Sequence, residues 1–398
     1  MSLDSKLNIY LSSGGVPRPK SNQLQPPRIG YLRQTKFGEV WVVDWFYEPG
    51  QIHGSQEIMK AGSIHALLDL KLGDFNPSLA TVIDTETTGL AGGTGTYAFI
   101  IGAGFWQDDR FVVRQYMMRD FNEEPAQLLA LSEDFTGSVI TFNGKCFDIP
   151  LLTSRFRLHR FDAIFENAPH LDMLFPSRRL WKRSLTSFKL THLEEKILGY
   201  ARVDDIPSYM IPSIFFDYLQ NRDETLLYPI LNHNRDDILS LYQLTVIATD
   251  LLKQCDSAGH NDDDLLLSIA EIYFNNCQFA DSLNILERIN PNFASEDTLK
   301  RANHIKALVY KRQGKWNKAV TAFAELHKLA PEMYSTIELA KLYEHKFKDP
   351  QKALEILSQA ESYLEFLACL GEGDNRLSEA LLHRKNRLRR KINRSLHI

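Results

Sequence analysis

Two acidic residues at the end of an apolar run are the first candidates for chemistry. Asp84 and Glu86 stand in the string 84–89 (DTETTG), directly after the run 79–83 (LATVI). Side chains two positions apart on a β-strand point to the same face, so the two carboxylates would project together. Their repulsion disfavours this arrangement unless a cation lies between them, and a divalent metal ion would supply that cation. The alternative is a pair of solvated carboxylates at a turn.

A third carboxylate lies where a strand gives way to a helix. Asp148 follows the strand-like run 138–142 (SVITF) and the turn 143–147 (NGKCF). Asp at a helix start, with Pro150 in the first turn, is a good N-cap, and capping alone would explain its presence. A capping aspartate could still face a metal ion.

A histidine and an aspartate lie one helical turn apart further along the chain. His233 and Asp237, in the string 233–238 (HNRDDI), share a helical face. They could place a proton acceptor beside a carboxylate ligand. The alternative is an ordinary solvated helix face.

The elements that must position these residues follow the order strand, hairpin, helix, strand, helix, which predicts a mixed α/β sheet flanked by helices. The expected strands are 79–84, 97–106, 111–118 and 138–142, and the expected helices are 124–135, one from 148, and one from about 225 to 253.

The chain on either side of this region differs in character. Residues 1–28 include a Ser, Gly and Pro-rich stretch without an apolar period, which predicts a flexible tail. Residues 29–75 form a β-rich segment whose function the sequence does not indicate. From residue 262 the strand signals end and an internal repeat begins.

The repeat combines an alanine with a tyrosine three residues later, at a spacing of about 34 residues. It occurs as Ala270 with Tyr273, Ala307 with Tyr310, and Ala340 with Tyr343. Ala319, Phe323 and Pro331 match the A-x3-F…P element of the tetratricopeptide pattern, in which small residues let paired helices approach. We therefore predict an all-α tetratricopeptide-repeat domain over 262–398. An ordinary helical bundle with chance alanine spacing is the alternative.

Composition limits the partners. The 398 residues carry a formal net charge of -4, so a polyanion must meet a local basic patch rather than a basic molecule. The candidate patch consists of Arg178, Arg179, Trp181, Lys182 and Arg183. The alternative is a solvated helix face in which the tryptophan is buried. Arginine and lysine would contact phosphates while the indole stacks on a base of a single strand. The longest apolar stretch, 97–106, is too short to span a bilayer, and the N-terminus has no signal pattern, so we predict a cytoplasmic protein without a membrane partner.

Taken in order, the three acidic motifs form a more specific pattern than each one alone. Residues 79–253 resemble the ribonuclease-H-like exonuclease superfamily with four acidic residues (DEDD, DnaQ-like), through VIDTETTGL, VITFNGKCFDIPLL, HLDML and HNRDDILSL. More narrowly, these strings resemble the YprB-like branch, predicted nucleases that often carry C-terminal tetratricopeptide repeats. The resemblance implies a five-stranded mixed sheet within an exonuclease domain at 76–255.

The resemblance also implies a site. Two Mg²⁺ or Mn²⁺ ions would be held by Asp84, Glu86, Asp148 and Asp237, and would serve phosphodiester hydrolysis. His233 would orient or deprotonate the attacking water. It lies four residues before Asp237, which is the tyrosine spacing of the superfamily, whereas the histidine-type spacing is five, so its assignment as the base stays open. Asp236 is an alternative ligand or a supporting residue, and Asp172 has the character of a structural acid.

Our leading hypothesis is a metal-dependent 3′→5′ exonuclease acting on single-stranded DNA or RNA, with the repeats recruiting a protein partner. The alternative is a non-catalytic adaptor that binds nucleic acid and assembles partners through the repeats. A nucleotide-cofactor site at 93–98 (GTGTYA) ranks below both, because a strand rather than a helix is expected after it.

Overall fold

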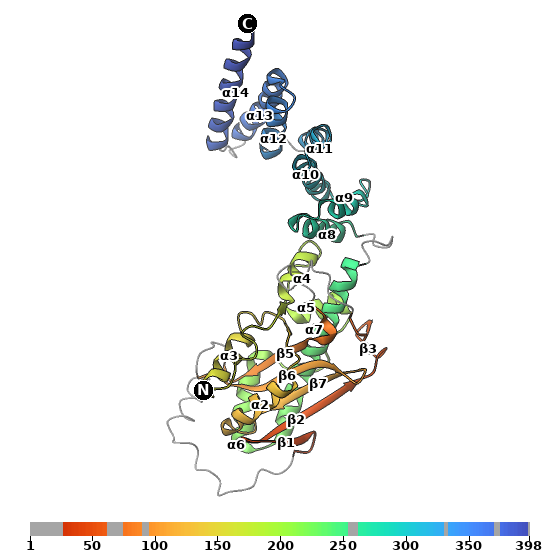
Figure 1. Ribbon diagram of the computed structural model, residues 1–398, viewed down its shortest axis with the longest axis vertical. Coiled ribbons are helices and arrows are strands. Elements are labelled where there is room, and N and C mark those ends of the chain that lie inside the picture. Colours follow the sequence, from red (N-terminus) through yellow and green to blue (C-terminus); the bar gives the residue numbers. More distant parts are fainter. Residues whose placement is uncertain are drawn as a thin grey trace. The chain divides into compact units, whose positions relative to one another are not determined.

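The computed structural model describes residues 27–61, 75–89, 95–253, 262–329, 333–369 and 375–396. The chain divides into two compact units, Met1–Ser257 and Ala258–Ile398, here called the sheet unit and the helical unit (Figure 1). The predicted flexible tail, residues 1–28, lies outside the described residues except for its last two positions.

A mixed sheet forms the centre of the sheet unit. Its seven strands, counted over the described residues, lie in the order β1-β2-β7-β6-β5-β8-β9. Strands β5, β8 and β9 run parallel, and the remaining neighbours pair antiparallel. The strands are β1 (Tyr31–Thr35), β2 (Gly38–Tyr47), β5 (Thr81–Thr87), β6 (Ala98–Gln107), β7 (Arg110–Met117), β8 (Val139–Thr141) and β9 (His170–Asp172). The expected hairpin is confirmed as β6 and β7, which pair from Ile100↔Met117 to Gln107↔Arg110.

The sheet has two strands more than the five expected, because the β-rich segment before it joins the same sheet. Strand β2 pairs with β7, and β1 folds back on β2. Val40 and Val42 belong to one hydrophobic core, whereas Trp41 and Val43 belong to the other. A strand with apolar residues on both sides is buried on both faces, so this segment is an integral part of the sheet. Residues 52–57 add a separate small hairpin of β3 (Ile52–His53) and β4 (Gln56–Glu57).

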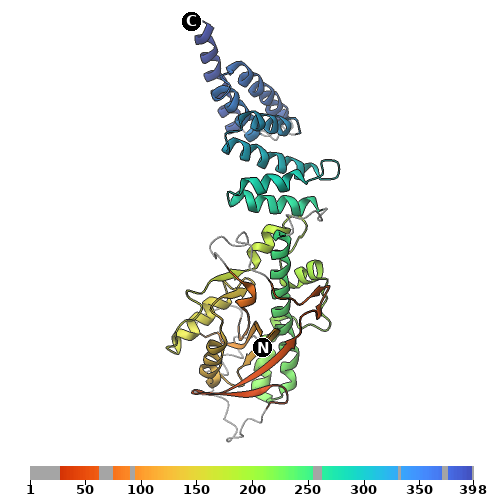
Figure 2. The ribbon, with the colours of Figure 1, turned by 45° about the vertical axis from the view of Figure 1, so that its right-hand side comes forward.

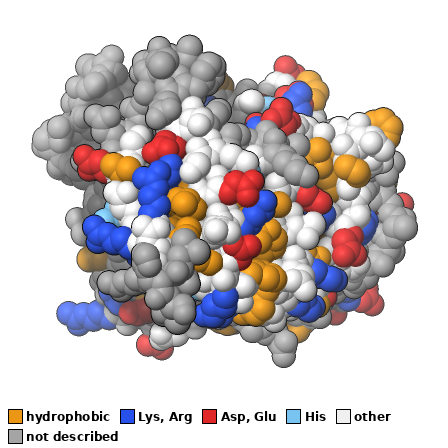
Figure 3. Space-filling model, turned by 90° about the horizontal axis from the view of Figure 1, so that it is seen from above, with side chains coloured by type: hydrophobic (Ala, Val, Ile, Leu, Met, Phe, Trp, Pro, Cys, Tyr) orange, Lys and Arg blue, Asp and Glu red, His pale blue; other side chains and the backbone are white. Residues whose placement is uncertain are grey.

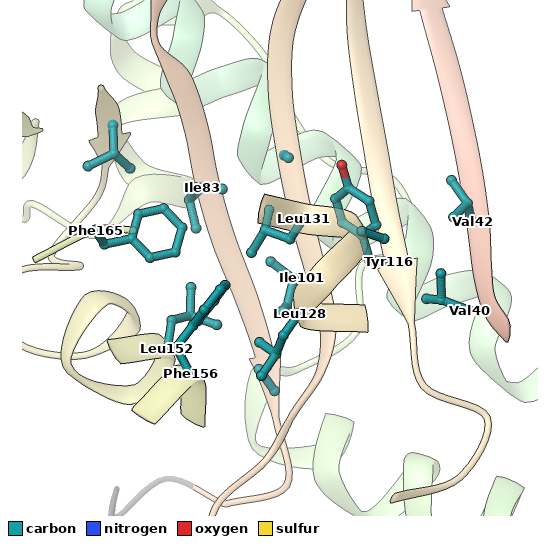
Figure 4. Packing of buried hydrophobic residues seen from close by; sticks show 14 of the residues in the cluster. Val40, Val42, Ile83, Ile101, Tyr116, Leu128, Leu131, Leu152, Phe156 and Phe165 are labelled. Atoms are coloured by element: carbon teal, nitrogen blue, oxygen red, sulfur yellow. The ribbon is translucent and has the colours of Figure 1, made fainter. Parts of the chain in front are cut away.

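Helices cover both faces of the sheet. On one face, α2 and α3 pack on alternate strand residues such as Ile83, Ile101 and Tyr116 (Figure 4). On the other face, α6 and the start of α7 pack on Phe99 and Met117. Figure 2 shows α7 as the long green helix of this unit. The helices, with η for 3-10 helices and for the π-helical η3, are η1 (Pro77–Leu79), η2 (Phe121–Glu123), α2 (Glu124–Asp134), α3 (Asp148–Leu158), α4 (Leu174–Trp181), α5 (Leu190–Leu193), η3 (Glu194–Leu198), η4 (Ser208–Met210), α6 (Ile211–Asn221), η5 (Glu224–Leu227) and α7 (Tyr228–Lys253).

The helical unit consists of helices that pack in consecutive pairs over its described residues. Helix α8 packs with α9, α10 with α11 and α12 with α13, and α14 packs on α13. The recurring Ala270, Ala307 and Ala340 are fully buried, as are Ala319 and Ala353. Small buried residues at these positions let paired helices approach closely, as the sequence pattern predicts. Pro331 lies outside the described residues, and the tetratricopeptide assignment stays a prediction. The helices are α8 (Asp263–Asn275), α9 (Phe279–Glu287), α10 (Glu296–Arg312), α11 (Trp316–Leu329), α12 (Met333–His345), α13 (Pro350–Cys369) and α14 (Asn375–Leu396).

Within the described ranges, no helix is both long enough and apolar enough to cross a membrane.

Candidate active site

Strand β5 presents Asp84 and Glu86 on the face that α7 covers. Ile83 points into the core under α2 and α3, so its neighbours in the strand point the other way. Asp84 lies opposite Gly102 of β6, and the register shifts after Glu86 at a β-bulge. The side chain of Glu86 is buried, with 8% of the residue exposed. The two carboxylates therefore share one face, as their spacing predicts.

Two glycines of β6 let α7 approach this face closely. A Cβ added at Gly102 would lie 2.2 Å from Oδ1 of Asn234, and one added at Gly104 would lie 2.4 Å from Cγ2 of Ile238. Asn234 is fully buried, and its Nδ2 donates to Oδ2 of Asp84 at 2.8 Å. Nε2 of Gln115 in turn donates to Oδ1 of Asn234 at 2.9 Å. The contact between β6 and α7 thus sets the distance between α7 and the sheet, and with it the position of the α7 side chains relative to β5.

We expect Gly102→Ala to lower the free energy of unfolding by about 1–3 kcal/mol, because the new methyl group overlaps Asn234 and must displace α7. Denaturant unfolding measures this loss. Gly95→Ala is the matched control, since a Cβ there meets nothing within 4 Å. Equal stability of the two variants would contradict the close contact.

Asp148 reaches back from α3 to β5. It is the first residue of α3, the N-cap position belongs to Phe147, and Asp148 Oδ1 accepts a hydrogen bond from Oγ1 of Thr85 at 2.5 Å. The N-cap explanation for Asp148 is therefore wrong in this structure.

The turn before Asp148 is held by Asp172. Oδ1 of Asp172 accepts from the backbone N of Asn143 at 2.7 Å, and Oδ2 accepts from that of Lys145 at 3.0 Å. Asp172 ends β9 beside Thr141 of β8 and is buried. This acid organises the turn, which agrees with the structural character expected of it.

Helix α7 places His233 and Asp237 next to Glu86 of β5. Nε2 of His233 lies 3.5 Å from Oδ2 of Asp237 and 3.9 Å from Oε1 of Glu86. Glu86, His233 and Asp237 each offer one ligand atom, and these atoms lie within 4.8 Å of one another. His233 is 7% exposed, so its ring is enclosed rather than on a solvated helix face.

Asp236 points away from this group. Its Oδ2 accepts from the hydroxyl of Tyr200 at 2.8 Å, and its Oδ1 accepts from Nε of Arg235 at 2.9 Å. These partners give Asp236 a structural environment of its own, so the geometry favours Asp237 as the acid that faces β5.

The structure adds two residues that the motifs did not indicate. Arg202 donates to both carboxylate oxygens of Glu194, at 2.8 and 2.6 Å, and also to Oδ1 of Asp237. Asp205 lies 2.6 Å from Nδ1 of His233. Both lie in the stretch between η3 and η4, where the sequence has no distinctive pattern. Asn234 could have been found, because it stands inside the HNRDDI string.

Burial raises the pKa values of Asp84, Glu86 and Asp148, and repulsion from the other acids adds to the effect at Asp84 and Glu86. Burial raises the pKa of Asp84 well above its ordinary value, and the charges of Asp237 and Asp148 raise it further. Burial also raises the pKa of Glu86, with the charges of Asp84, Asp237 and Asp148 adding to the effect. Burial raises the pKa of Asp148 to about 6, against the opposing hydrogen bond from Thr85. The four acids therefore feel one another's charge in a place poor in water.

This set of donors fits divalent metal ions. Carboxylate oxygens are the ligands that Mg²⁺ and Mn²⁺ prefer, and a neutral imidazole is compatible with Mn²⁺. Arg202 is shared among Glu194, Asp205 and Asp237, so its single charge cannot offset all the acids gathered here. A cation between the carboxylates would relieve the repulsion that raises their pKa values.

The proposed nucleic-acid patch is only partly exposed. Trp181 at the end of α4 is 4% exposed, so its indole is packed inside and cannot stack on a base; the expectation for this residue is corrected. Arg178, Arg179 and Lys182 are exposed, and Arg183 is half-buried. Elsewhere on the surface, in the view from above in Figure 3, basic and acidic side chains are interspersed, which agrees with the low net charge.

Comparison with known proteins agrees with the mixed α/β fold. Residues 81–249, which include all four acids and His233, match the family model of the RNase_H superfamily. Over 325 residues the chain is 32% identical to the uncharacterized protein YprB of Bacillus subtilis (strain 168), covering 80% of this chain and 76% of YprB. The chain therefore belongs to the family that includes YprB, and its residues 81–249 form an RNase H superfamily domain. Membership of this superfamily points to a nuclease, and nucleases with this fold use divalent metal ions.

Proposed function

We propose that the protein is a metal-dependent 3′→5′ exonuclease that hydrolyses phosphodiester bonds of single-stranded DNA or RNA. The observation that carries the proposal is that four acids lie close enough for their charges to act on one another. They are Asp84 and Glu86 from β5, Asp148 from α3 and Asp237 from α7. Four acids gathered in one place, one of them buried and three half-buried, repel one another unless a cation lies between them, and phosphodiester hydrolysis uses such cations.

Each residue has a role that follows from its position. Asp84, Glu86, Asp148 and Asp237 would hold two ions, and His233 would accept a proton through Nε2, which faces Glu86 and Asp237. When bound, the ions would lower the pKa of a water molecule and stabilise the attacking and leaving oxygens. Asn234 holds the carboxylate of Asp84 in place, and Thr85 does the same for Asp148.

The substrate and the partner are proposed from the surface. Arg178, Arg179, Lys182 and Arg183 would contact the phosphates of a single strand, without the stacking first expected from Trp181. The paired helices of the helical unit, with buried alanines at the repeat positions, would act as tetratricopeptide repeats that recruit a protein.

The test uses the purified full chain with single-stranded DNA and RNA, labelled at the 5′ or the 3′ end, in Mg²⁺, Mn²⁺ or EDTA. We expect a ladder of shortened products from 5′-labelled strands, release of the label as a mononucleotide from 3′-labelled strands, and no products in EDTA. Internal cuts without a ladder would make the enzyme an endonuclease. Binding in a gel shift without hydrolysis in either metal would favour the adaptor function instead.

A further inference from the structure

We propose that Asp205 is a positioning residue that holds the ring of His233 with Nε2 directed at the carboxylates of Glu86 and Asp237. The inference rests on the proposed function, because it gives His233 a reason to be oriented. Asp205 stands in the segment between η3 and η4, here called the bracing segment, residues 199–207.

The short contact on Nδ1 decides which ring nitrogen carries the proton. Oδ1 of Asp205 lies 2.6 Å from Nδ1 of His233, and an ionised carboxylate can only accept a hydrogen bond. This contact therefore calls for a proton on Nδ1. Nη1 of Arg202 lies 3.1 Å from the same Nδ1 and can only donate, so it would suit an Nδ1 without a proton; the contact to Asp205 is 0.5 Å shorter, and we assign the proton to Nδ1 on that ground.

A proton on Nδ1 leaves Nε2 of the neutral ring as an acceptor. Nε2 lies 3.5 Å from the carboxylate of Asp237 and 3.9 Å from that of Glu86, which is too far for good direct hydrogen bonds. An ionised carboxylate is also an acceptor, so it cannot donate to Nε2. Nε2 can therefore accept from a donor placed beside these carboxylates. A water molecule at this point can give its proton to Nε2, which is the role that hydrolysis needs.

The bracing segment is tied at its beginning to β3, to the β3–β4 turn and to α7. Gly199 has a φ of +61°, and the preceding Leu198 accepts from N of Ser55 at 2.7 Å and from its Oγ at 2.8 Å. Tyr200 bonds Asp236 on α7 and its ring lies 4.1 Å from that of His53.

Arg202 completes the brace. It is 7% exposed as a side chain, and it links Glu194 of η3 to Asp237 of α7. The same guanidinium lies 3.5 Å from Oδ2 of Asp205. An oriented carboxylate behind an imidazole fixes both the tautomer and the direction of the ring, and loss of such a partner typically lowers activity about 10–100-fold.

The first experiment reads the tautomer directly and needs no activity. The full chain is labelled with ¹⁵N-histidine and its ring nitrogens are observed at pH 8 in EDTA, with His233→Gln identifying the signal. We expect Nδ1–H in the wild type and loss of that tautomer preference in Asp205→Ala. The matched control is Asp204→Asn, which removes the same charge from the neighbouring residue, where φ is +55°, a conformation that Asn adopts readily, and it should leave the His233 signal unchanged.

The second experiment measures hydrolysis with the same variants. We expect Asp205→Ala to lower kcat about 10–100-fold with KM nearly unchanged, and Asp204→Asn to behave as the wild type. An Nε2–H tautomer in the wild type, or an unchanged His233 signal in Asp205→Ala, overturns the positioning role. The expected tautomer change in a protein that hydrolyses nothing supports the positioning role and rejects the nuclease function instead.

Discussion

Asp84→Asn is expected to reduce metal-dependent hydrolysis by on the order of 10³-fold or more, because the reaction depends on charge held at this carboxylate. Asn has nearly the same shape, and its amide oxygen can still accept the bond that Asn234 donates to Asp84. The substitution therefore removes charge with little change in packing. Initial rates on end-labelled strands in Mn²⁺ measure the loss.

The same variant should be at least as stable as the wild type in EDTA. Asp84 has a raised pKa in the folded protein, so its ionised form destabilises the fold at neutral pH, and this cost disappears when the charge is removed. The melting temperature of the wild type should rise when Mn²⁺ is added, whereas that of Asp84→Asn should rise much less.

Asp109→Asn is the control for this pair of measurements. It removes one acidic charge from the exposed β6–β7 turn, where φ is +66°, a conformation that Asn adopts readily. It should retain both activity and the Mn²⁺-dependent rise in melting temperature. Wild-type rates in Asp84→Asn would falsify the assignment of this carboxylate to the chemistry.

His233→Ala should lower kcat by about 10²–10⁴-fold, the range that a positioned proton acceptor contributes. The four carboxylates remain, so Mn²⁺ should still raise the melting temperature nearly as much as in the wild type. Rates at saturating Mn²⁺, together with thermal unfolding with and without the metal, measure both effects.

The two readouts separate two roles for this histidine. If His233 were needed chiefly as a ligand beside Glu86 and Asp237, its removal would weaken the Mn²⁺ effect on stability, and a higher Mn²⁺ concentration would restore the rate. His192→Gln, at a half-buried histidine of α5, serves as the control and should change neither quantity.

The sequence alone was sufficient for the local elements and for which candidate residues share a face. Alternation placed Asp84 and Glu86 on one face of a strand, and helical spacing placed His233 and Asp237 on one face of a helix. The hairpin of β6 and β7, the start of α3 and the long α7 all lie where local patterns predicted them. Such features depend on residues close in the chain, so a single sequence contains the information.

Features that depend on residues far apart in the chain were harder to predict from the sequence. Strands β1 and β2 of the β-rich segment became part of the main sheet through pairing of β2 with β7, across about seventy residues, and no local pattern encodes which edge a strand will join. Burial of Trp181 was likewise decided by packing around α4, since an aromatic ring among basic residues suits a surface or a core equally well in sequence.

The sequence by itself therefore determined which residues could carry the chemistry and which elements would hold them. Only the tertiary structure decided how they meet: Gly102 and Gly104 admit α7, Asn234 fixes Asp84, and Asp205 reaches His233 from a segment without a motif. The physical reason is that these contacts need a particular distance and direction between elements, and those are set by the packing of the whole unit.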